Sequence, residues 1–472
     1  MKIKHIALQL FLLLNVVWLS AQNNTNSPYS SKGFGETEPF TNTYNRALGG
    51  TFNGVRSARN ISLSNPASLG AITSVVFDFA FRADYTKISN EANYKTANNG
   101  SFNYFTLGVP IYRKLAYKQD STNKNLIFKS YRTIWSSAIG LIPYSTSNSL
   151  YYREKDTSFG STTNFYSING SINKFFWMNA YNVTKSWSVG ANLAYLFGQK
   201  NNERSLLLND SARSHIIFDN RKLRINGFAF SFGTQFERNK DTFRRYKRDT
   251  SGKIIGVKTR TLKVVFGASL NSNNTLNAKI NQLIVSQSLV YNSIRDTIYS
   301  NEIARQKTRL PLGFSMGASI TLSNLWMFSF DYQRSLLSLM DKNVFQDSFS
   351  NSTQFNFGFA YRPDMDPESH KKRKLNLEYR FGFRYNNTGI NFVDNLGYLS
   401  PMKEYGISFG IGIPRNTDYW DGKKMTNKSM INLTAEYIKR GTVQNGLISE
   451  DLYRLTVGFN LSDVWFVKRK YN

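Results

Sequence analysis

Side chains able to carry out acid–base or nucleophilic chemistry are scarce in this chain. The sequence has no cysteine and three histidines, of which only His215 and His370 lie beyond the apolar start of the chain. His370 stands in the charged run ESHKKRK, and His215 stands in a stretch that fits either a loop or a strand. Catalysis needs a nucleophile or base held beside a partner, and zinc needs several clustered ligands. We therefore predict no catalytic residue, no metal site and no cofactor.

Charged residues inside otherwise apolar segments are better functional candidates. In the segment KLNLEYRFGFRY, Glu378, Arg380 and Arg384 alternate with tyrosine and phenylalanine, and Asp78 and Arg82 occupy similar positions in an earlier segment. Ionisable groups that face the interior of a barrel can select what passes or can pair with a plug. A ladder of structural salt bridges between neighbouring strands is an equally good interpretation, and the sequence leaves the two open.

These charges belong to segments with a period of two, which is the pattern of β-strands. The clearest segments put aromatic and aliphatic residues on one face and small or polar residues on the other: residues 75–82, 225–236, 262–270, 355–362, 375–385, 405–413 and 453–461. A soluble antiparallel sandwich also alternates. Three features favour a membrane barrel instead: unbroken apolar faces, mid-strand Arg and Glu on the opposite faces, and Tyr and Trp near strand ends.

We predict an all-β fold, a transmembrane antiparallel β-barrel of about fourteen strands. Residues 275–290 are the weakest candidate strand, and residues 198–220 fit either a loop or a strand. If both termini are periplasmic, the connection at 440–451 is extracellular. Long, polar and charged connections are expected at residues 238–259, 362–374 and 414–428.

Three regions follow one another along the chain. Residues 1–21 have a short basic start, an apolar core and a small-residue end, which is the plan of a signal peptide. Residues 22–72 are rich in Asn, Ser, Gly and Thr and indicate a compact irregular segment. Residues 73–472 form the barrel. The chain is therefore expected to be exported and to reside in the cell outer membrane of a Gram-negative bacterium.

The charge of the chain is strongly positive. The formal net charge is +29, and it falls to +27 when Lys2 and Lys4 leave with residues 1–21. This excess indicates anionic neighbours, such as lipopolysaccharide phosphates, anionic solutes in a lumen or an acidic partner. Lys and Arg that simply solvate loops account for part of it. No nucleic-acid-binding module is recognisable, and the export signal argues against nucleic acid as a partner.

Both ends of the mature chain resemble the FadL-like family of outer-membrane transport proteins. The start carries SPYSSKGFG, RALGGTFNG and the NPASL stretch from Asn65 to Leu69, and the end carries EYGISFGIGIP followed by INLTAEYIKRGTVQNGLISEDLYRLTVGFNLSDVWFVKRKY. The resemblance implies a porin-like barrel of fourteen strands with an N-terminal hatch in the lumen. It also implies a gate around Asn65, Pro66 and Ala67. Family members often carry an acidic residue shortly before this motif, whereas this chain has Arg56 and Arg59 there.

Two classes of function follow from these observations. The first is a FadL-like channel for the uptake of hydrophobic or amphipathic small molecules, gated by the N-terminal segment. The alternative is a non-transporting accessory or plug component of a protein secretion machinery, of the type IX kind. The partners expected for one or the other are the lipid bilayer and lipopolysaccharide, a hydrophobic ligand, the barrel-assembly machinery and a secretion translocon.

Overall fold

The fold is described from a computed structural model of the chain. The structure describes residues 27–119, 126–157, 160–208, 215–248, 254–288, 295–340, 344, 349–363, 377–416, 419–420, 423–424 and 428–463. Residues 1–21, His370 and most of 362–374 lie outside this set. Within it, no helix has both the length and the apolar composition needed to cross a membrane.

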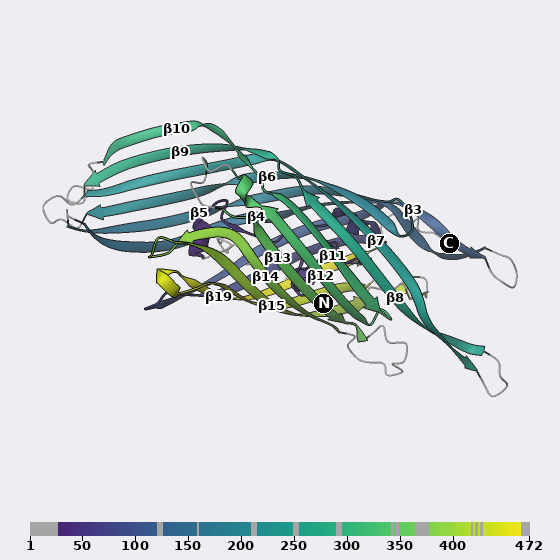
Figure 1. Cartoon of the computed structure of the whole chain (residues 1–472). Helices are drawn as coiled ribbons and strands as arrows, with labels where there is room; N and C mark the ends of the chain where they lie inside the picture. The colour runs from purple at the N-terminus through teal and green to yellow at the C-terminus, as the bar shows by residue number, and fades with distance from the viewer. Residues whose placement is uncertain are drawn as a thin grey trace, which may run out of the picture.

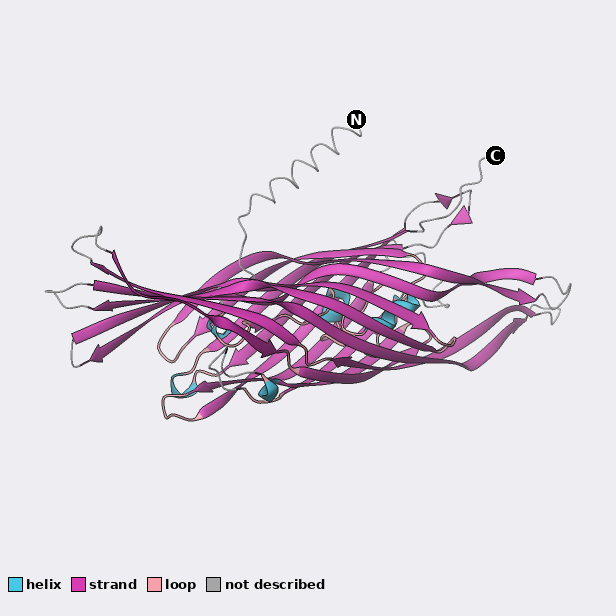
Figure 2. Cartoon of the chain, turned by 90° about the horizontal axis from the view of Figure 1, so that it is seen from above, coloured by secondary structure: helices cyan, strands magenta, loops and turns pink. Residues whose placement is uncertain are grey.

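Antiparallel strands form a closed barrel and make up most of the described chain (Figures 1 and 2). The ring closes because β19 pairs with β2 and β8 pairs with β11. Fourteen strands form it: β2 (Val75–Ser89), β3 (Tyr94–Gln119), β4 (Leu126–Thr157), β5 (Gly160–Asn182), β6 (Trp187–Leu208), β7 (His215–Arg248), β8 (Ile254–Asn271), β11 (Leu312–Leu322), β12 (Trp326–Leu336), β13 (Ser352–Tyr361), β14 (Glu378–Val393), β15 (Leu399–Asn416), β18 (Lys428–Gly441) and β19 (Ser449–Asp463). The predicted fold class and strand number are confirmed.

The two faces of the wall differ in the way that a lipid bilayer requires. On β14, Phe381 has 50% of its surface exposed, whereas the adjacent Arg380 has 0%. The apolar residues of the alternating segments thus point outward, and the charged and small residues point inward, which is the reverse of a soluble protein. Outward aromatic residues also mark the two ends of the apolar zone, as in the girdles of membrane barrels: Trp135, Tyr181, Trp187 and Trp326 at one end, and Tyr85, Tyr405, Tyr437 and Tyr453 at the other.

The end of the barrel where β2 begins and β19 finishes is here called the terminal end, and the opposite end is called the distal end. Val75 pairs with Asp463, so the described strands start and finish together. At the distal end, β9 (Thr275–Ser288) and β10 (Arg295–Arg309) form a hairpin outside the ring. Here β9 pairs with the first half of β7. The weak segment 275–290 is therefore a strand, although not one of the fourteen.

Two predictions about connections need correction. Residues 238–259 were expected to be a long connection, but β7 runs to Arg248 and β8 starts at Ile254. Residues 414–428 likewise include the end of β15 and the two-residue strands β16 (Tyr419–Trp420) and β17 (Lys423–Lys424). Beyond the membrane both faces of a strand meet water, so these strands lack the alternation by which strands are recognised. The ambiguous stretch 198–220 is strand up to Leu208 and again from His215.

Residues 27–72, here called the inner segment, have little regular structure. Its elements are short: η1 (Pro28–Ser31), β1 (Glu36–Thr37), α2 (Thr43–Arg46) and η2 (Pro66–Ala71). All of its residues from Thr41 to Val55 are buried. In Figure 1 the segment, coloured purple, is seen between the strands of the barrel wall. The elements η3 (Leu337–Leu339) and η5 (Gln444–Gly446) lie in distal connections.

Candidate functional site: the inner segment and the barrel wall

The NPASL motif fixes the last turn of the inner segment. Asn65 caps η2, because its side-chain oxygen accepts a hydrogen bond from the Ala67 N–H at 3.1 Å. Pro66 follows at the first helical position, where a missing N–H costs nothing. The amide nitrogen of Asn65 also donates to the carbonyl oxygens of Thr234 on β7 and Ala268 on β8, at 3.3 and 3.4 Å. The motif therefore joins the inner segment to the wall as well as shaping it.

Glycines on the inner face of the wall let the two backbones approach closely. A Cβ added to Gly190 would lie 2.5 Å from the backbone of Pro66 and Ala67, and one added to Gly233 would lie 2.1 Å from Oδ1 of Asn65. On the far side of the barrel, a Cβ on Gly382 would lie 1.8 Å from the Gly49 nitrogen. Real Cβ atoms do not come this close, so the glycines recurring in the alternating segments make room for the inner segment.

Every strand of the ring contacts the inner segment. Gln235 of β7, for example, donates to the Asn53 carbonyl at 2.8 Å, and Asp331 of β12 accepts from the backbone N–H groups of Phe52 and Asn53. Each of the fourteen strands supplies at least one such residue: Arg82, Tyr104, Ser136, Asn182, Ser188, Gln235, Lys263, Ser319, Asp331, Asn356, Arg380, Ser408, Glu436 and Arg454.

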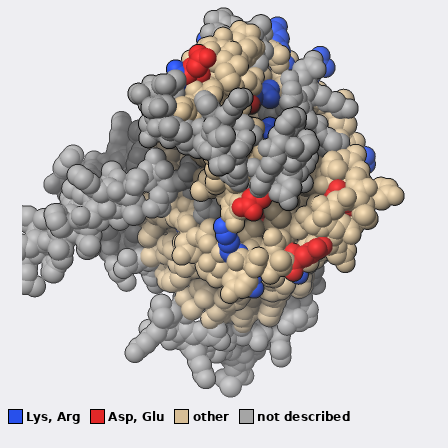
Figure 3. Space-filling model, turned by 90° about the vertical axis from the view of Figure 1, so that its left-hand side faces the viewer, with Lys and Arg blue, Asp and Glu red and all other residues tan. Residues whose placement is uncertain are grey.

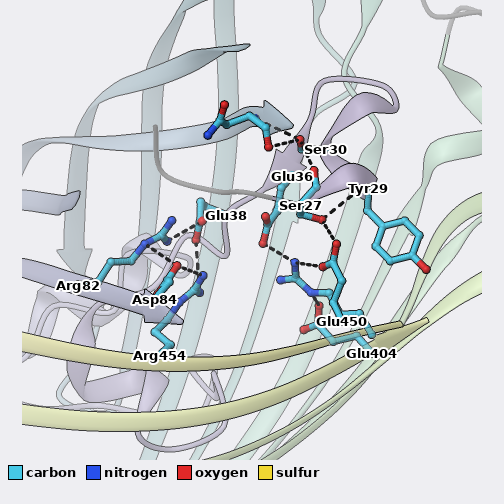
Figure 4. Close-up of polar contacts among 12 residues, drawn as sticks. Ser27, Tyr29, Ser30, Glu36, Glu38, Arg82, Asp84, Glu404, Glu450 and Arg454 are labelled. Carbon is cyan, nitrogen blue, oxygen red and sulfur yellow. Dashed lines mark hydrogen bonds and ion pairs between the residues drawn. The ribbon is translucent and has the colours of Figure 1, made fainter. Parts of the chain in front are cut away.

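A buried cluster of ion pairs holds the inner segment on its distal side (Figure 4). Glu38 lies at its centre, 2.6 Å from Arg82 of β2, 3.1 Å from Arg46 of the inner segment and 3.9 Å from Arg454 of β19. Asp84 of β2 pairs in turn with Arg454 at 2.9 Å and with Arg82 at 3.4 Å. The cluster thus ties α2 and the residues before it to the seam between the first and last strands.

A second group extends the cluster along β14, β15 and β18. Arg440 pairs with Glu36 at 2.6 Å and with Glu404 at 2.8 Å. Arg384, one of the predicted lumen-facing charges, lies between Glu404 at 3.0 Å and Glu436 at 3.5 Å. Near β19, the hydroxyl of Ser27 donates to the carboxylate of Glu450 (Figure 4).

The cluster is close to neutral. Six carboxylates face five guanidinium groups: Glu36, Glu38, Asp84, Glu404, Glu436 and Glu450, and Arg46, Arg82, Arg384, Arg440 and Arg454. Burying charges is costly unless they are paired, and removing one partner leaves another charge uncompensated. Burial acts to raise the pKa of Glu38, but Arg82, Arg454 and Arg46 together hold it well below its usual range. The inner segment is therefore fixed by groups that cannot separate cheaply.

A smaller group holds the inner segment at the terminal end. Arg56 pairs with Glu237 of β7 at 3.0 Å, and Lys263 of β8 reaches the same carboxylate at 3.1 Å. Arg56 also donates to Ser188 at 2.7 Å. The sequence lacks the acidic residue that often precedes the NPA motif in FadL-like proteins. Here the wall supplies an acid, Glu237, to a basic residue of the inner segment.

The five predicted charges lie on the buried face of the wall but in different surroundings. Asp78 has no ion pair among the described residues and instead accepts hydrogen bonds from Tyr104 and Asn460. Glu378 pairs with Arg362 and Arg380, at 3.0 and 3.2 Å. Arg380 packs 4.1 Å from the ring centre of Tyr44 in the inner segment. Arg82 and Arg384 belong to the distal cluster. What these charges do for function stays a prediction.

Sequence reasoning missed the inner segment's own contribution to the cluster. Glu36, Glu38 and Arg46 stand in an irregular stretch, where no periodicity marks a charged residue as buried. Asp84 and Glu450 could have been found, because each shares strand parity with inward residues of the same strand. Ser27 and Glu450 are 423 positions apart, so their contact could not be read from spacing.

A cavity of about 330 Å³ lies between the inner segment and the wall. Aromatic and aliphatic side chains from both sides line much of it, including Phe34, Phe40, Tyr144, Leu196 and Met340. Lys174 of β5 also lines it, with its ammonium 3.6 Å from the ring centre of Phe40. Among the described residues no group of His, Cys, Asp and Glu could hold a metal ion.

The closed barrel with its buried N-terminal segment has the fold of solved FadL-like outer-membrane proteins. Similar solved structures include the toluene transporter TodX of P. putida, with 13% identity, a TM-score of 0.52, and 90% of this chain and 100% of TodX covered. A FadL homologue of Pseudomonas aeruginosa shares 13% identity with a TM-score of 0.50, and the match covers 90% of this chain and 98% of that one. Identities this low establish the fold alone.

The sequence identifies the family. Residues 2–122 and 130–472 match the model of the BamG family, so the chain belongs to this family. A comparison with curated proteins found no similar sequence.

Proposed function

We propose that this protein is a non-transporting accessory subunit of the barrel-assembly machinery of the outer membrane. The observation that carries the proposal is the contact of the inner segment with all fourteen ring strands. A segment that the wall holds from every side would close the barrel permanently, which fits a structural subunit better than a channel. The family name BamG supports the assembly machinery as the partner.

The energetics of the inner segment support a closed barrel. A gate that opens for each ligand must exchange its contacts with the wall at small cost. Here, opening would separate Glu38 from Arg82 and Arg454, and Arg46 from Glu436, all within a buried cluster. Separating one such buried pair costs about 3–5 kcal/mol. Three separations would leave an open population too small to sustain transport.

The proposal includes a topology. Residues 1–21 direct export and are removed, residues 22–72 form the plug, and residues 73–472 form the barrel. The terminal end then faces the periplasm, where both ends of single-chain bacterial barrels lie, and the distal hairpin of β9 and β10 faces outward. This arrangement leaves the aromatic side chains of the wall in contact with lipid and with lipopolysaccharide.

A second function is favoured by the cavity beside Phe34 and Phe40. Its volume of about 330 Å³ is at the lower end of the range of ligand pockets. A hydrophobic or amphipathic molecule with an acidic group would pair with Lys174 there. FadL-like uptake through this cavity is the alternative to an accessory role. It requires the inner segment to move.

Purification from native outer membranes separates the two functions. The full chain carries an affinity tag, membranes are solubilised in mild detergent, and the recovered proteins are quantified by mass spectrometry. The accessory role predicts near-stoichiometric recovery of the central barrel subunit of the assembly machinery. A tagged outer-membrane barrel of another family, expressed at the same level, is the control. Recovery of the protein alone, with a bound apolar molecule, would support the channel instead.

A further inference from the structure

Two strand hairpins project beyond the rest of the barrel at its terminal end (Figure 1). The first, here called the β3–β4 arm, comprises residues 113–119 and 126–132. The second, here called the β7–β8 arm, comprises residues 237–248 and 254–263. Between them, β5 and β6 are joined by the short turn at residues 183–186.

Apart from Leu262 and Lys263, which still pair with Leu322 and Thr321 of β11, the described residues of each arm form a two-stranded ribbon without a third strand beside it. The ladder between β4 and β5 ends at the pair Trp135–Tyr181, while β3 and β4 continue to Gln119 and Leu126. The ladder between β6 and β7 ends at Trp187–Phe236, while β7 continues to Arg248. Trp135, Tyr181 and Trp187 belong to the aromatic girdle, so the arms lie outside the membrane.

The arms concentrate positive charge. Residues 113–119 and 126–132 contain five Lys and Arg and no acidic residue. Residues 237–248 and 254–263 contain nine Lys and Arg against two acids, Glu237 and Asp241. Together they carry a net charge of +12 out of +29 for the whole chain. At the distal end, by contrast, residues of both signs are dispersed over the surface (Figure 3).

The strand register places like charges opposite one another in both arms. Lys114 pairs with Arg132 between β3 and β4, and Arg245 pairs with Lys258 between β7 and β8. Like charges directly opposite in a ladder are destabilising, and a two-stranded ribbon is only marginally stable by itself in water. Both arms thus keep an arrangement that weakens them as free hairpins. An anionic partner would relieve it.

We infer that the two arms bind the acidic face of another subunit of the assembly machinery, on the periplasmic side. This inference rests on the proposed function. Reach favours a protein over anionic lipid headgroups. The twelve residues of β7 beyond Phe236 span roughly 40 Å along the strand, or about 28 Å of height at a 45° tilt. The headgroup layer is only about 5–8 Å deep, so the far half of this arm lies beyond it.

Charge reversal at the two like-charged pairs tests the inference. The variant K114E/R245E turns both pairs into Glu–Lys or Glu–Arg pairs, which favour the folded hairpins. The control K307E/R309E reverses two exposed charges on β10 at the distal end. Co-purification with the central barrel subunit of the assembly machinery should fall at least tenfold for the arm variant. It should stay within twofold of the wild type for the control. For the wild type, recovery should also fall as the salt concentration rises.

Several results would overturn the inference. Undiminished recovery of the machinery by K114E/R245E would show that the arms are not the contact. In a second assay, the protein is held in zwitterionic nanodiscs and floated with phosphatidylglycerol vesicles. If K114E/R245E weakens this flotation but leaves recovery of the machinery unchanged, the arms bind lipid.

Photo-cross-linking from Tyr117 and Tyr246 distinguishes failure of the proposed function from failure of the arm surface. If the wild type recovers no machinery, cross-links to another acidic periplasmic protein would reject the proposed function and keep the surface as a protein contact. No cross-link at all would reject both.

Discussion

Replacement of Glu38 by Gln is the sharpest perturbation of the inner segment. The change preserves side-chain volume and removes one charge from the centre of the distal cluster. Arg82, Arg46 and Arg454 lie 2.6, 3.1 and 3.9 Å from that carboxylate. After the substitution, Asp84 still pairs with Arg82 and Arg454, and Glu436 still pairs with Arg46.

The expected cost follows from this count. Breaking a buried ion pair costs about 3–5 kcal/mol, because the surviving charge stays buried without a partner. Each arginine keeps one acid, so the low end of about 3 kcal/mol applies. That corresponds to a population of the detached inner segment that is larger by about a hundredfold.

Amide hydrogen exchange of the folded barrel in detergent micelles measures this population. Peptides covering residues 43–55 should lose about a hundredfold of their protection in E38Q, while wall peptides keep theirs. The control E203Q changes an exposed distal carboxylate that accepts hydrogen bonds only from Asn201 and Asn220 among the described residues, and it should have little effect. Adding R46Q to E38Q removes a buried cation that has lost one of its two acids and should restore part of the protection. Protection in E38Q within threefold of wild type would refute the idea that the cluster holds the inner segment.

Three further predictions concern the wall and the pH dependence of closure. Gly233→Val should lower the free energy of unfolding by about 1–3 kcal/mol, because the added side chain overpacks against Asn65. Gly313→Ala should change it little, because a Cβ at this position would meet only side-chain atoms, at 3.3 Å and beyond. Urea unfolding in lipid vesicles compares the two variants. Phe357→Arg, on the lipid-facing side of β13, should cost about 2–4 kcal/mol in the same assay, and Phe357→Leu should be nearly neutral. The pKa of Glu38 is lowered in the folded protein, so the stabilising effect of its charge is complete above the ordinary carboxylate range and is lost as the pH falls through the lowered value. Channel openings in planar bilayers should therefore be absent from pH 8 to 5, and any openings should appear below about pH 4. Openings that become more frequent toward neutral pH would contradict this role of Glu38.

The wall was largely predictable from the sequence. In β14, β15 and β19 one face meets lipid and the other meets packed polar groups, so apolar and polar residues alternate along the sequence of each strand. The estimate of about fourteen combines a tally of roughly fifteen candidate segments with the even strand number of single-chain bacterial barrels and the weakness of residues 275–290. The hairpin of β9 and β10 and the two arms could not be identified from the sequence. Strands outside the membrane need no apolar face, so their residues do not alternate in the way that marks a membrane strand.

The inner segment was predictable in outline only. Its irregular composition and the resemblance to FadL-like proteins pointed to a hatch, and Asn65 does cap a turn against the wall. The cluster around Glu38 was not foreseeable. Its members come from five strands and the inner segment, and the contacts between Glu38 and Arg454 depend on closure of the ring rather than on local sequence.

The central claim, that the inner segment closes the barrel of a non-transporting subunit, is tested most directly by reconstituting the full chain in planar lipid bilayers and proteoliposomes at neutral pH. We predict no stable conductance and no saturable flux of an apolar probe such as toluene beyond that of protein-free liposomes, with E38Q producing openings that the wild type lacks. Steady conductance, or saturable uptake of the probe by the wild type, would contradict the account and identify the protein as a channel.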